Sequence, residues 1–305
     1  MIQAETGRIS TIVVSTALGP GGRGIFPYTL LPAYRWLLRA VRETGTTVFA
    51  KSATRFPRQG NFRAFNPLTW KYIKRLPDLG MLNAYGLTNH GVTACAGAIK
   101  VSGSQGFNVI PNFYPEFAKG TDTAIKETLE AIGLYQKLLG PSFWALELNF
   151  SCPNSQEAIR ENVAQALKCF QDVKGKYPGL FLLAKISICH PYEFAQELEK
   201  LGVNALHALN TIPYEIVYPQ KRSPLWQVGG GGVSGGPAFA AALDYNMGLR
   251  KQVSLPLIMG CGVRNREDVQ RYLDAGADAV SICTLALRKP GEAAAVITSF
   301  NKGST

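Results

Sequence analysis

Eight short apolar runs rich in β-forming residues recur along the 305 residues, and stretches of helical character separate them. Strict alternation of strands and helices is typical of a parallel sheet, and eight continuous apolar strands favour closure into a barrel. The sequence therefore predicts an α/β fold of the TIM (β/α)8 barrel type, with residues 1–305 as a single domain. The expected strands cover residues 11–14, 47–52, 107–113, 144–151, 181–187, 205–210, 256–262 and 279–284.

Seven helices are expected between these strands, at residues 28–43, 121–138, 158–173, 192–201, 237–251, 264–275 and 291–300. In the sixth, Val269, Tyr272 and Leu273 have the spacing of a buried helix face. Gly276 follows that helix at a point where a left-handed residue is favoured. Residues 53–106 are rich in Pro, Gly and Asn and show little periodicity, so we expect a long functional loop near the active site.

Composition gives expectations about location and metals. No apolar run approaches the roughly 20 residues of a membrane helix, and the first residues lack a signal-peptide pattern. We therefore expect a cytoplasmic protein without membrane association. The six cysteines form no CxxC pair and the three histidines are scattered, so we expect no metal site and no disulfide framework.

The net charge of +11 is concentrated near the N-terminus. Residues 1–80 hold 12 Lys/Arg and three Asp/Glu, a difference of 12 − 3 = +9. Such a basic region attracts small acids, nucleic acid or an acidic partner. A solvated basic surface that keeps the protein soluble is an equally good interpretation.

Polar residues follow several of the apolar runs, at the ends where parallel barrels carry their catalytic groups. Lys51 ends the second run and Lys185 ends the fifth. A lysine inside a barrel is costly unless an anion or an electron-rich ring receives it, so these residues predict a ligand; an outward, snorkelling side chain is the alternative. Four amides together suit a planar ring such as a pyrimidine, although each alone is an ordinary turn residue: Asn83, Asn149, Asn154 and Asn210.

The glycine-rich stretch GGGGVSGG at residues 229–236 precedes a predicted helix. Glycines let backbone N–H groups approach an anion, and a helix start favours one. Barrel phosphate sites often use the loops after strands seven and eight, so this stretch, residues 261–262 and residues 283–284 could converge on one phosphate. The stretch matches neither a Walker loop nor a GxGxxG fingerprint, and a flexible loop is the alternative.

Cys152 lies in the string NFSCPNS just past the fourth strand. A cysteine at a barrel mouth can act as a nucleophile or a general base, whereas a small buried apolar residue is the alternative. The neighbouring Ser151, Pro153 and Asn154 favour the reactive role.

The chain resembles class 1 dihydroorotate dehydrogenases in the strings ELNFSCPNS, FAKSATRFPRQGN, LNAYGLTNHG, AKIS, ALNT, GGVSG and GCGVRNREDVQRYLDAGADAVSICTLAL. The likeness extends from about Thr47 to Leu287; before it, VVSTALGPGG stands where the family has its first flavin-contacting loop. The resemblance implies FMN-dependent oxidation of (S)-dihydroorotate to orotate in UMP biosynthesis. It also implies fumarate, or a partner subunit with an iron–sulfur cluster and FAD, as electron acceptor, and a homodimer or a heterotetramer.

The resemblance implies roles for individual residues. Cys152 would take a proton from C5 of the substrate, FMN would take a hydride from C6 at N5, and Lys51 would help to form the thiolate. The implied substrate residues are Lys51, Asn83, Tyr85, Gly86, Leu87, Asn149, Asn154, Asn210 and Thr211. The implied FMN residues are Lys51, Ser52, Lys185, Gly231, Gly232, Ser234, Gly235, Cys261, Gly262, Cys283 and Thr284.

Four residues depart from the family pattern. Cys261 and Cys283 stand where glycine is common, Tyr85 where methionine is frequent and Thr211 where serine is frequent. The two substrate positions leave open a different pyrimidine or a related acid as substrate.

Two other interpretations differ in class. A tRNA-dihydrouridine synthase would share the FMN barrel and the cysteine, and RNA would suit the charge. The SCPN string, the early end of the chain after strand eight and residues 210–211 favour a free pyrimidine, so a nucleic-acid partner is not expected. A non-catalytic flavin- or ligand-binding protein is the other interpretation, and the intact Cys152 and Lys51 argue against it.

Overall fold

The computed structural model describes residues 1–151 and 156–302, with the side chains of residues 156–160 outside this description. Nine parallel strands form one sheet, in the order β7 (Asn108–Ile110), β4 (Thr47–Phe49), β3 (Ile12–Ser15), β15 (Ala279–Ile282), β14 (Leu257–Gly260), β11 (Ala205–Ala208), β10 (Phe181–Ile186), β9 (Ala145–Asn149) and β8 (Asn112–Phe113). The first and last strands of this order are separated in the sequence by Pro111 alone. The sheet therefore closes on itself, and the predicted (β/α)8 barrel is confirmed.

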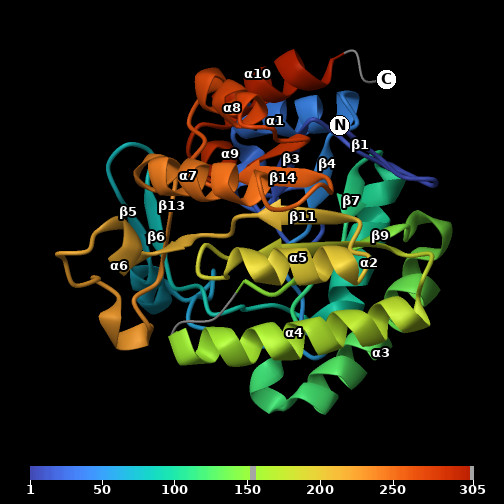
Figure 1. The fold of residues 1–305 in the computed structure, drawn as a ribbon. Coiled ribbons are helices and arrows are strands. Elements are labelled where there is room, and N and C mark those ends of the chain that lie inside the picture. The colour runs from blue at the N-terminus through green and yellow to red at the C-terminus, as the bar shows by residue number, and fades with distance from the viewer. Residues whose placement is uncertain (152–155, 303–305) are drawn as a thin grey trace.

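Helices surround this barrel (Figure 1). The seven expected helices are present as α1 (Pro32–Glu43), α3 (Thr121–Leu139), α4 (Gln156–Lys176), α5 (Tyr192–Lys200), α7 (Phe239–Arg250), α8 (Arg266–Asp274) and α10 (Pro290–Asn301). In α8 the predicted face is buried, with Val269 and Tyr272 fully covered and Leu273 partly covered. Gly276 has φ +92, as the C-terminal position predicts. In the part of the chain that the structure describes, no helix is long and apolar enough to cross a membrane.

Three helices were not expected: α2 (Gly91–Ser104), α6 (Tyr214–Val217) and α9 (Thr284–Arg288). The prediction of one long loop over residues 53–106 is therefore wrong for its last third. The helix α2 occupies the helical layer between β4 and β7 and packs against α3. Its buried residues include Val92, Cys95 and Ile99, but its exposed face also carries Ala94 and Val101, so the sequence shows little contrast between the two faces.

The first part of the same segment builds a small antiparallel sheet. Its strand order is β12 (Ile212–Pro213), β13 (Gly232–Ser234), β6 (Met81–Asn83) and β5 (Ile73–Arg75). Figure 1 shows β5, β6 and β13 beside one end of the barrel, with the N-terminal strand β1 (Ile2–Gln3) at the other end. The small sheet joins segments about 150 positions apart in the chain, since Asn83 pairs with Gly232.

An apolar layer fills the part of the barrel interior that lies toward the N-terminal ends of the strands. Each strand contributes one buried residue, with β7 and β8 counted as one strand: Val13, Phe49, Ile110, Ala145, Leu183, Ala205, Ile258 and Ala279. Ile2 from β1 and Ile9 from β2 (Arg8–Ile9) pack onto the same cluster. The antiparallel β1–β2 hairpin therefore covers the N-terminal end of the barrel.

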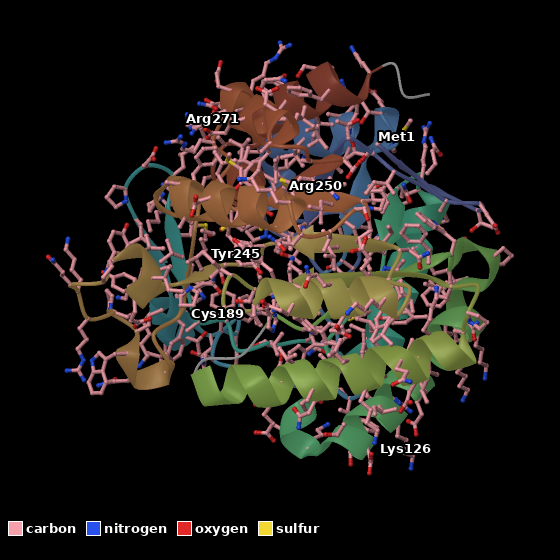
Figure 2. All side chains as sticks on the ribbon, in the orientation of Figure 1. Met1, Lys126, Cys189, Tyr245, Arg250 and Arg271 are labelled. Atoms are coloured by element: carbon pink, nitrogen blue, oxygen red, sulfur yellow. The ribbon has the colours of Figure 1, made fainter. Side chains whose placement is uncertain are left out.

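Buried polar side chains tie the outer helices to each other and to the barrel. Tyr245, labelled on α7 in Figure 2, donates its hydroxyl to the carbonyl oxygen of His190 before α5, at 2.9 Å. At the end of α10, the fully buried Asn301 accepts from the Ile12 N–H at 2.9 Å and donates to the Ile12 carbonyl at 3.0 Å. These bonds satisfy backbone groups of β3 that the sheet leaves free.

Candidate active site

A layer of polar residues lies directly above the apolar layer. Side chains alternate between the two faces of a strand, so the residue two positions further along each strand also points into the barrel. The interior thus changes from apolar to polar toward the C-terminal mouth, where barrels of this type carry their chemistry. The eight positions hold Ser15, Lys51, Asn112, Glu147, Lys185, His207, Gly260 and Ser281.

Two lysines of this layer bring positive charge to the mouth. The buried Lys185 donates from Nζ to Ser15 Oγ at 2.9 Å. Lys51 places its Nζ 3.5 Å from the centre of the Tyr85 ring, and burial, aided by the charge of Lys185, lowers its pKa to about 8. No carboxylate among the described residues forms an ion pair with either lysine. The predicted inward orientation is confirmed, and the pair is suited to an anionic or electron-rich ligand.

An amide and hydroxyl network brings predicted residues of three strands together. Asn149 at the end of β9 donates to Ser52 Oγ at 3.0 Å and accepts from the Ser151 hydroxyl at 2.5 Å. Asn210, just after β11, donates to the same Ser151 oxygen at 2.7 Å. The buried Ser151 therefore fixes the backbone that leads directly to Cys152.

The ends of β14 and β15 present backbone donors. Cys261 and Gly262 have φ of +76 and +94, in the left-handed region that favours glycine. Among the described residues, the N–H groups of Gly262, Cys283 and Thr284 have no hydrogen-bond acceptor. The Thr284 hydroxyl donates to Ser234 Oγ at 2.8 Å, which joins the end of β13 to this corner. Unpaired N–H groups at adjacent strand ends form a receptor for an anion.

The two thiols at this corner are not reactive groups. Burial raises the pKa of Cys261 to about 12, and burial also raises the pKa of Cys283. Both side chains are therefore neutral near pH 7. Cys261 and Cys283 therefore offer their backbone groups, rather than reactive side chains, at the ends of these strands. This agrees with the common use of glycine at both positions.

The small antiparallel sheet forms the wall on the other side of the mouth. Asn83 donates to the Gly232 carbonyl at 3.4 Å, and a Cβ at Gly232 would lie 2.1 Å from Thr211 Oγ1. Gly231 has φ +77, Gly235 has φ +79, and Gly232 lies in a strand. The glycine stretch is therefore a strand between two turns, and it was not recognised as such from the sequence.

The turn after β6 carries the predicted residues 85–87. Gly86 and Leu87 have positive φ of +76 and +60. The Tyr85 ring packs on Phe62 with centroids 4.9 Å apart, and it also contacts Lys51. The turn therefore presents an aromatic ring at the mouth in place of the flexible methionine that is frequent in the family.

The predicted Cys152 and Asn154 lie outside the described residues. In contrast, three buried residues of the mouth were not singled out from the sequence: Glu147, His207 and Asn112. The signal was a charged residue inside an apolar strand, since Glu147 begins the string ELNFSCPN. Ser15 and Thr16 were also missed, and Thr16 Oγ1 lies 3.7 Å from the sulfur of Cys283.

The barrel is closed, its mouth carries lysines and amides, and free backbone donors lie at the ends of β14 and β15. This combination is typical of a cofactor-dependent barrel enzyme. The sequence model of the family described as dihydroorotate dehydrogenase matches residues 39–300. The chain therefore belongs to the dihydroorotate dehydrogenase family, and the class 1 resemblance is confirmed. Enzymes of this class are FMN-dependent oxidoreductases.

Two curated relatives and one solved structure illustrate the similarity. The catalytic subunit of dihydroorotate dehydrogenase B (NAD(+)) from Oceanobacillus iheyensis is 29% identical over 259 residues, covering 80% of this chain and 76% of that protein. Dihydroorotate dehydrogenase A (fumarate) from Limosilactobacillus reuteri is 27% identical over 253 residues, covering 79% and 75%. The crystal structure of ligand-free DHODH from Eimeria tenella aligns with a TM-score of 0.64 and 16% identity, covering 95% of this chain and 82% of that chain, which supports the fold alone.

The residues of the mouth fit FMN. The three unpaired N–H groups match the acceptor oxygens of a phosphate, and the unpaired positive charge of Lys185 matches a ring that becomes more negative on reduction. Gly262 has no room for a side chain, because a Cβ there would lie 2.4 Å from Phe239 Cα. Gly262 therefore packs directly against the start of α7, where only glycine fits.

Proposed function

We propose that this chain oxidises (S)-dihydroorotate to orotate with FMN, as a step of pyrimidine biosynthesis, and that Cys152 is the base. The observation that carries the proposal is the polar layer of the barrel mouth in a chain whose family match covers residues 39–300. The buried Lys185 and the half-buried Lys51, neither of which forms an ion pair in the described part of the chain, suit an anionic substrate beside an electron-accepting ring.

The chain binds and orients the substrate through the residues at the strand ends. Lys51 and the amides Asn83, Asn149 and Asn210 face the carboxylate and the ring C=O and N–H groups of a pyrimidine acid. The family resemblance adds Asn154 and Thr211 to this set. Backbone groups of residues 85–87 meet the carboxylate. When bound, FMN supplies the acceptor for the hydride that leaves C6.

The chain holds FMN through two groups of residues. Gly262, Cys283, Thr284 and Ser234 hold the phosphate, together with the turns that contain Gly231, Gly232, Gly235 and Cys261. Lys185, Lys51 and Ser52 would hold the flavin ring. Lys185 is the residue of this set best placed to stabilise added negative charge.

Cys152 accepts the proton from C5, so it must first become a thiolate. The adjacent Ser151 is held by hydrogen bonds with Asn149 and Asn210. The positive charge of Lys51 at the mouth favours the thiolate. Above pH 8, Lys51 loses its charge, and both substrate binding and thiolate formation should weaken.

Anaerobic flavin reduction tests the proposal. The purified protein should be yellow, and addition of dihydroorotate without oxygen should bleach the visible band of the oxidised flavin. Cys152→Ala should retain FMN and reduce it about 10²–10⁴-fold more slowly, because a general base contributes a factor of this size. Loss of bleaching in the wild type refutes the substrate assignment, and an unchanged rate in Cys152→Ala refutes the assignment of the base.

The electron acceptor, the assembly and the location are part of the same proposal. The acceptor is fumarate or a partner subunit with an iron–sulfur cluster and FAD, in a homodimer or a heterotetramer, in the cytoplasm. One relative is named as a fumarate enzyme and the other as the catalytic subunit of an NAD(+) enzyme, so both types occur among the relatives. Reoxidation of the reduced flavin by fumarate, measured on the purified chain alone, separates them.

A further inference from the structure

Glu147 and His207 form a fully buried pair inside the polar layer. Glu147 lies on β9 and His207 on β11, with Lys185 on β10 between them. The strand register places Lys185 beside His207, and Glu147 beside Asn112 of β8. His207 Nδ1 is hydrogen-bonded to one oxygen of Glu147, and Asn112 Nδ2 donates to the other.

The hydrogen bonds favour an ionised carboxylate. Burial alone would raise the pKa of Glu147, but its interactions with His207, Lys185 and Asn112, which include two hydrogen bonds to the carboxylate, outweigh burial and lower the pKa. Burial lowers the pKa of His207 against the pull of Glu147. We therefore assign a carboxylate to Glu147 and a neutral imidazole, with its proton on Nδ1, to His207.

The pair would be energetically unfavourable if its only role were to fill the core. His207 Nε2 and Asn112 Oδ1 are buried and have no hydrogen-bond partner among the described residues. A buried polar atom without a partner destabilises the fold, whereas the layer directly below is entirely apolar. The Phe49 ring packs on the imidazole with centroids 5.1 Å apart, so an apolar side chain at position 207 would pack well. The charge of Glu147 is thus the feature that distinguishes this pair from a packed core.

We propose that Glu147 and His207 are positioning residues that set the reduction potential of the flavin. The inference depends on the proposed FMN site above Lys185. Reduction adds negative charge to the flavin ring, and the ammonium of Lys185 favours the reduced form. The carboxylate of Glu147 offsets part of that positive charge from below and keeps the flavin able to pass its electrons on. His207 acts through Glu147, because its hydrogen bond keeps the carboxylate ionised.

The midpoint potential of the FMN-loaded protein tests this inference. It is measured at pH 7 by spectroelectrochemical titration, without any substrate. Glu147→Gln removes the negative charge with little change in shape, and the ratio of reduced to oxidised flavin at a fixed applied potential should rise about tenfold. For a two-electron couple this is a shift of about 30 mV to more positive potential. His207→Phe should shift the potential in the same direction by a smaller amount.

A matched control removes another buried carboxylate far from the flavin. Glu127→Gln on α3 breaks an ion pair with Lys119 outside the barrel and should leave the potential unchanged. FMN content and thermal unfolding of every variant are measured first; if Glu147→Gln does not fold, His207→Phe decides. Yellow, folded variants with the potential of the wild type overturn the inference. A colourless wild type would instead overturn the proposed FMN site, so the two failures are distinguishable.

Discussion

Lys51→Met should make the FMN-free protein more stable while it weakens ligand binding. The pKa of Lys51 falls from 10.5 to about 8, a difference of 2.5 units. At 1.36 kcal/mol per unit, the buried ammonium costs about 3 kcal/mol at pH 7. Its contact with the Tyr85 ring returns about 1 kcal/mol. The methionine variant should therefore gain about 2 kcal/mol, or about 3 °C in melting temperature for a chain of this size.

The pH dependence gives the sign of this effect a separate check. The native lysine gives up its proton near pH 8, whereas the unfolded lysine keeps it until pH 10.5. The wild type should thus gain stability relative to Lys51→Met as the pH rises between these values. The difference in stability between the wild type and Lys51→Met is measured by thermal unfolding from pH 7 to pH 10. Lys100→Met on the exposed face of α2 is the control. A variant no more stable than the wild type at pH 7, or a gap independent of pH, refutes the reasoning.

Three further substitutions test packing and hydrogen bonding in the barrel and its helices. Gly262→Ala should lose more than about 2 kcal/mol of stability and retain less FMN, because its Cβ would clash with Phe239, whereas Gly291→Ala, where a Cβ meets nothing within 4 Å, should be tolerated. Asn301→Ala leaves the buried N–H of Ile12 unpaired, while the Ile12 carbonyl keeps its bond from the Ser10 hydroxyl, and should cost about 1–3 kcal/mol by thermal unfolding; a loss below about 0.5 kcal/mol would contradict this. Asp268→Asn removes the charge that accepts three hydrogen bonds from Arg264 and should cost about 2 kcal/mol in denaturant titration.

The barrel could be predicted from the sequence because its signals are local. Each core strand is a continuous apolar run, and helices such as α8 show one buried face over two turns. The segment from residue 53 to 106 lacks such signals. Its strands β5 and β6 are three residues long and are completed by β13, which follows about 150 residues later. A pairing of that kind cannot be seen in any local pattern.

The candidate site was predicted unevenly for a similar reason. Asn149, Ser52 and Asn210 were identified and do contact one another through Ser151. Glu147 and His207 were not singled out, because each lies in an apolar strand. Their role becomes visible only when the fold brings the two side chains into hydrogen-bond contact from two strands apart. Local sequence patterns indicate where a strand lies, but they do not indicate which strands are neighbours in the sheet.

The covered N-terminal end of the barrel has a consequence for exchange with solvent. Ile2 and Ile9 are buried against the apolar layer at that end and hinder access of water from this side. A ligand seated over Lys185 would then isolate the inner carboxylate from bulk protons. Proton exchange at Glu147 would be fast in the empty protein and slow in the loaded one, and deletion of the first nine residues would restore it from the opposite side.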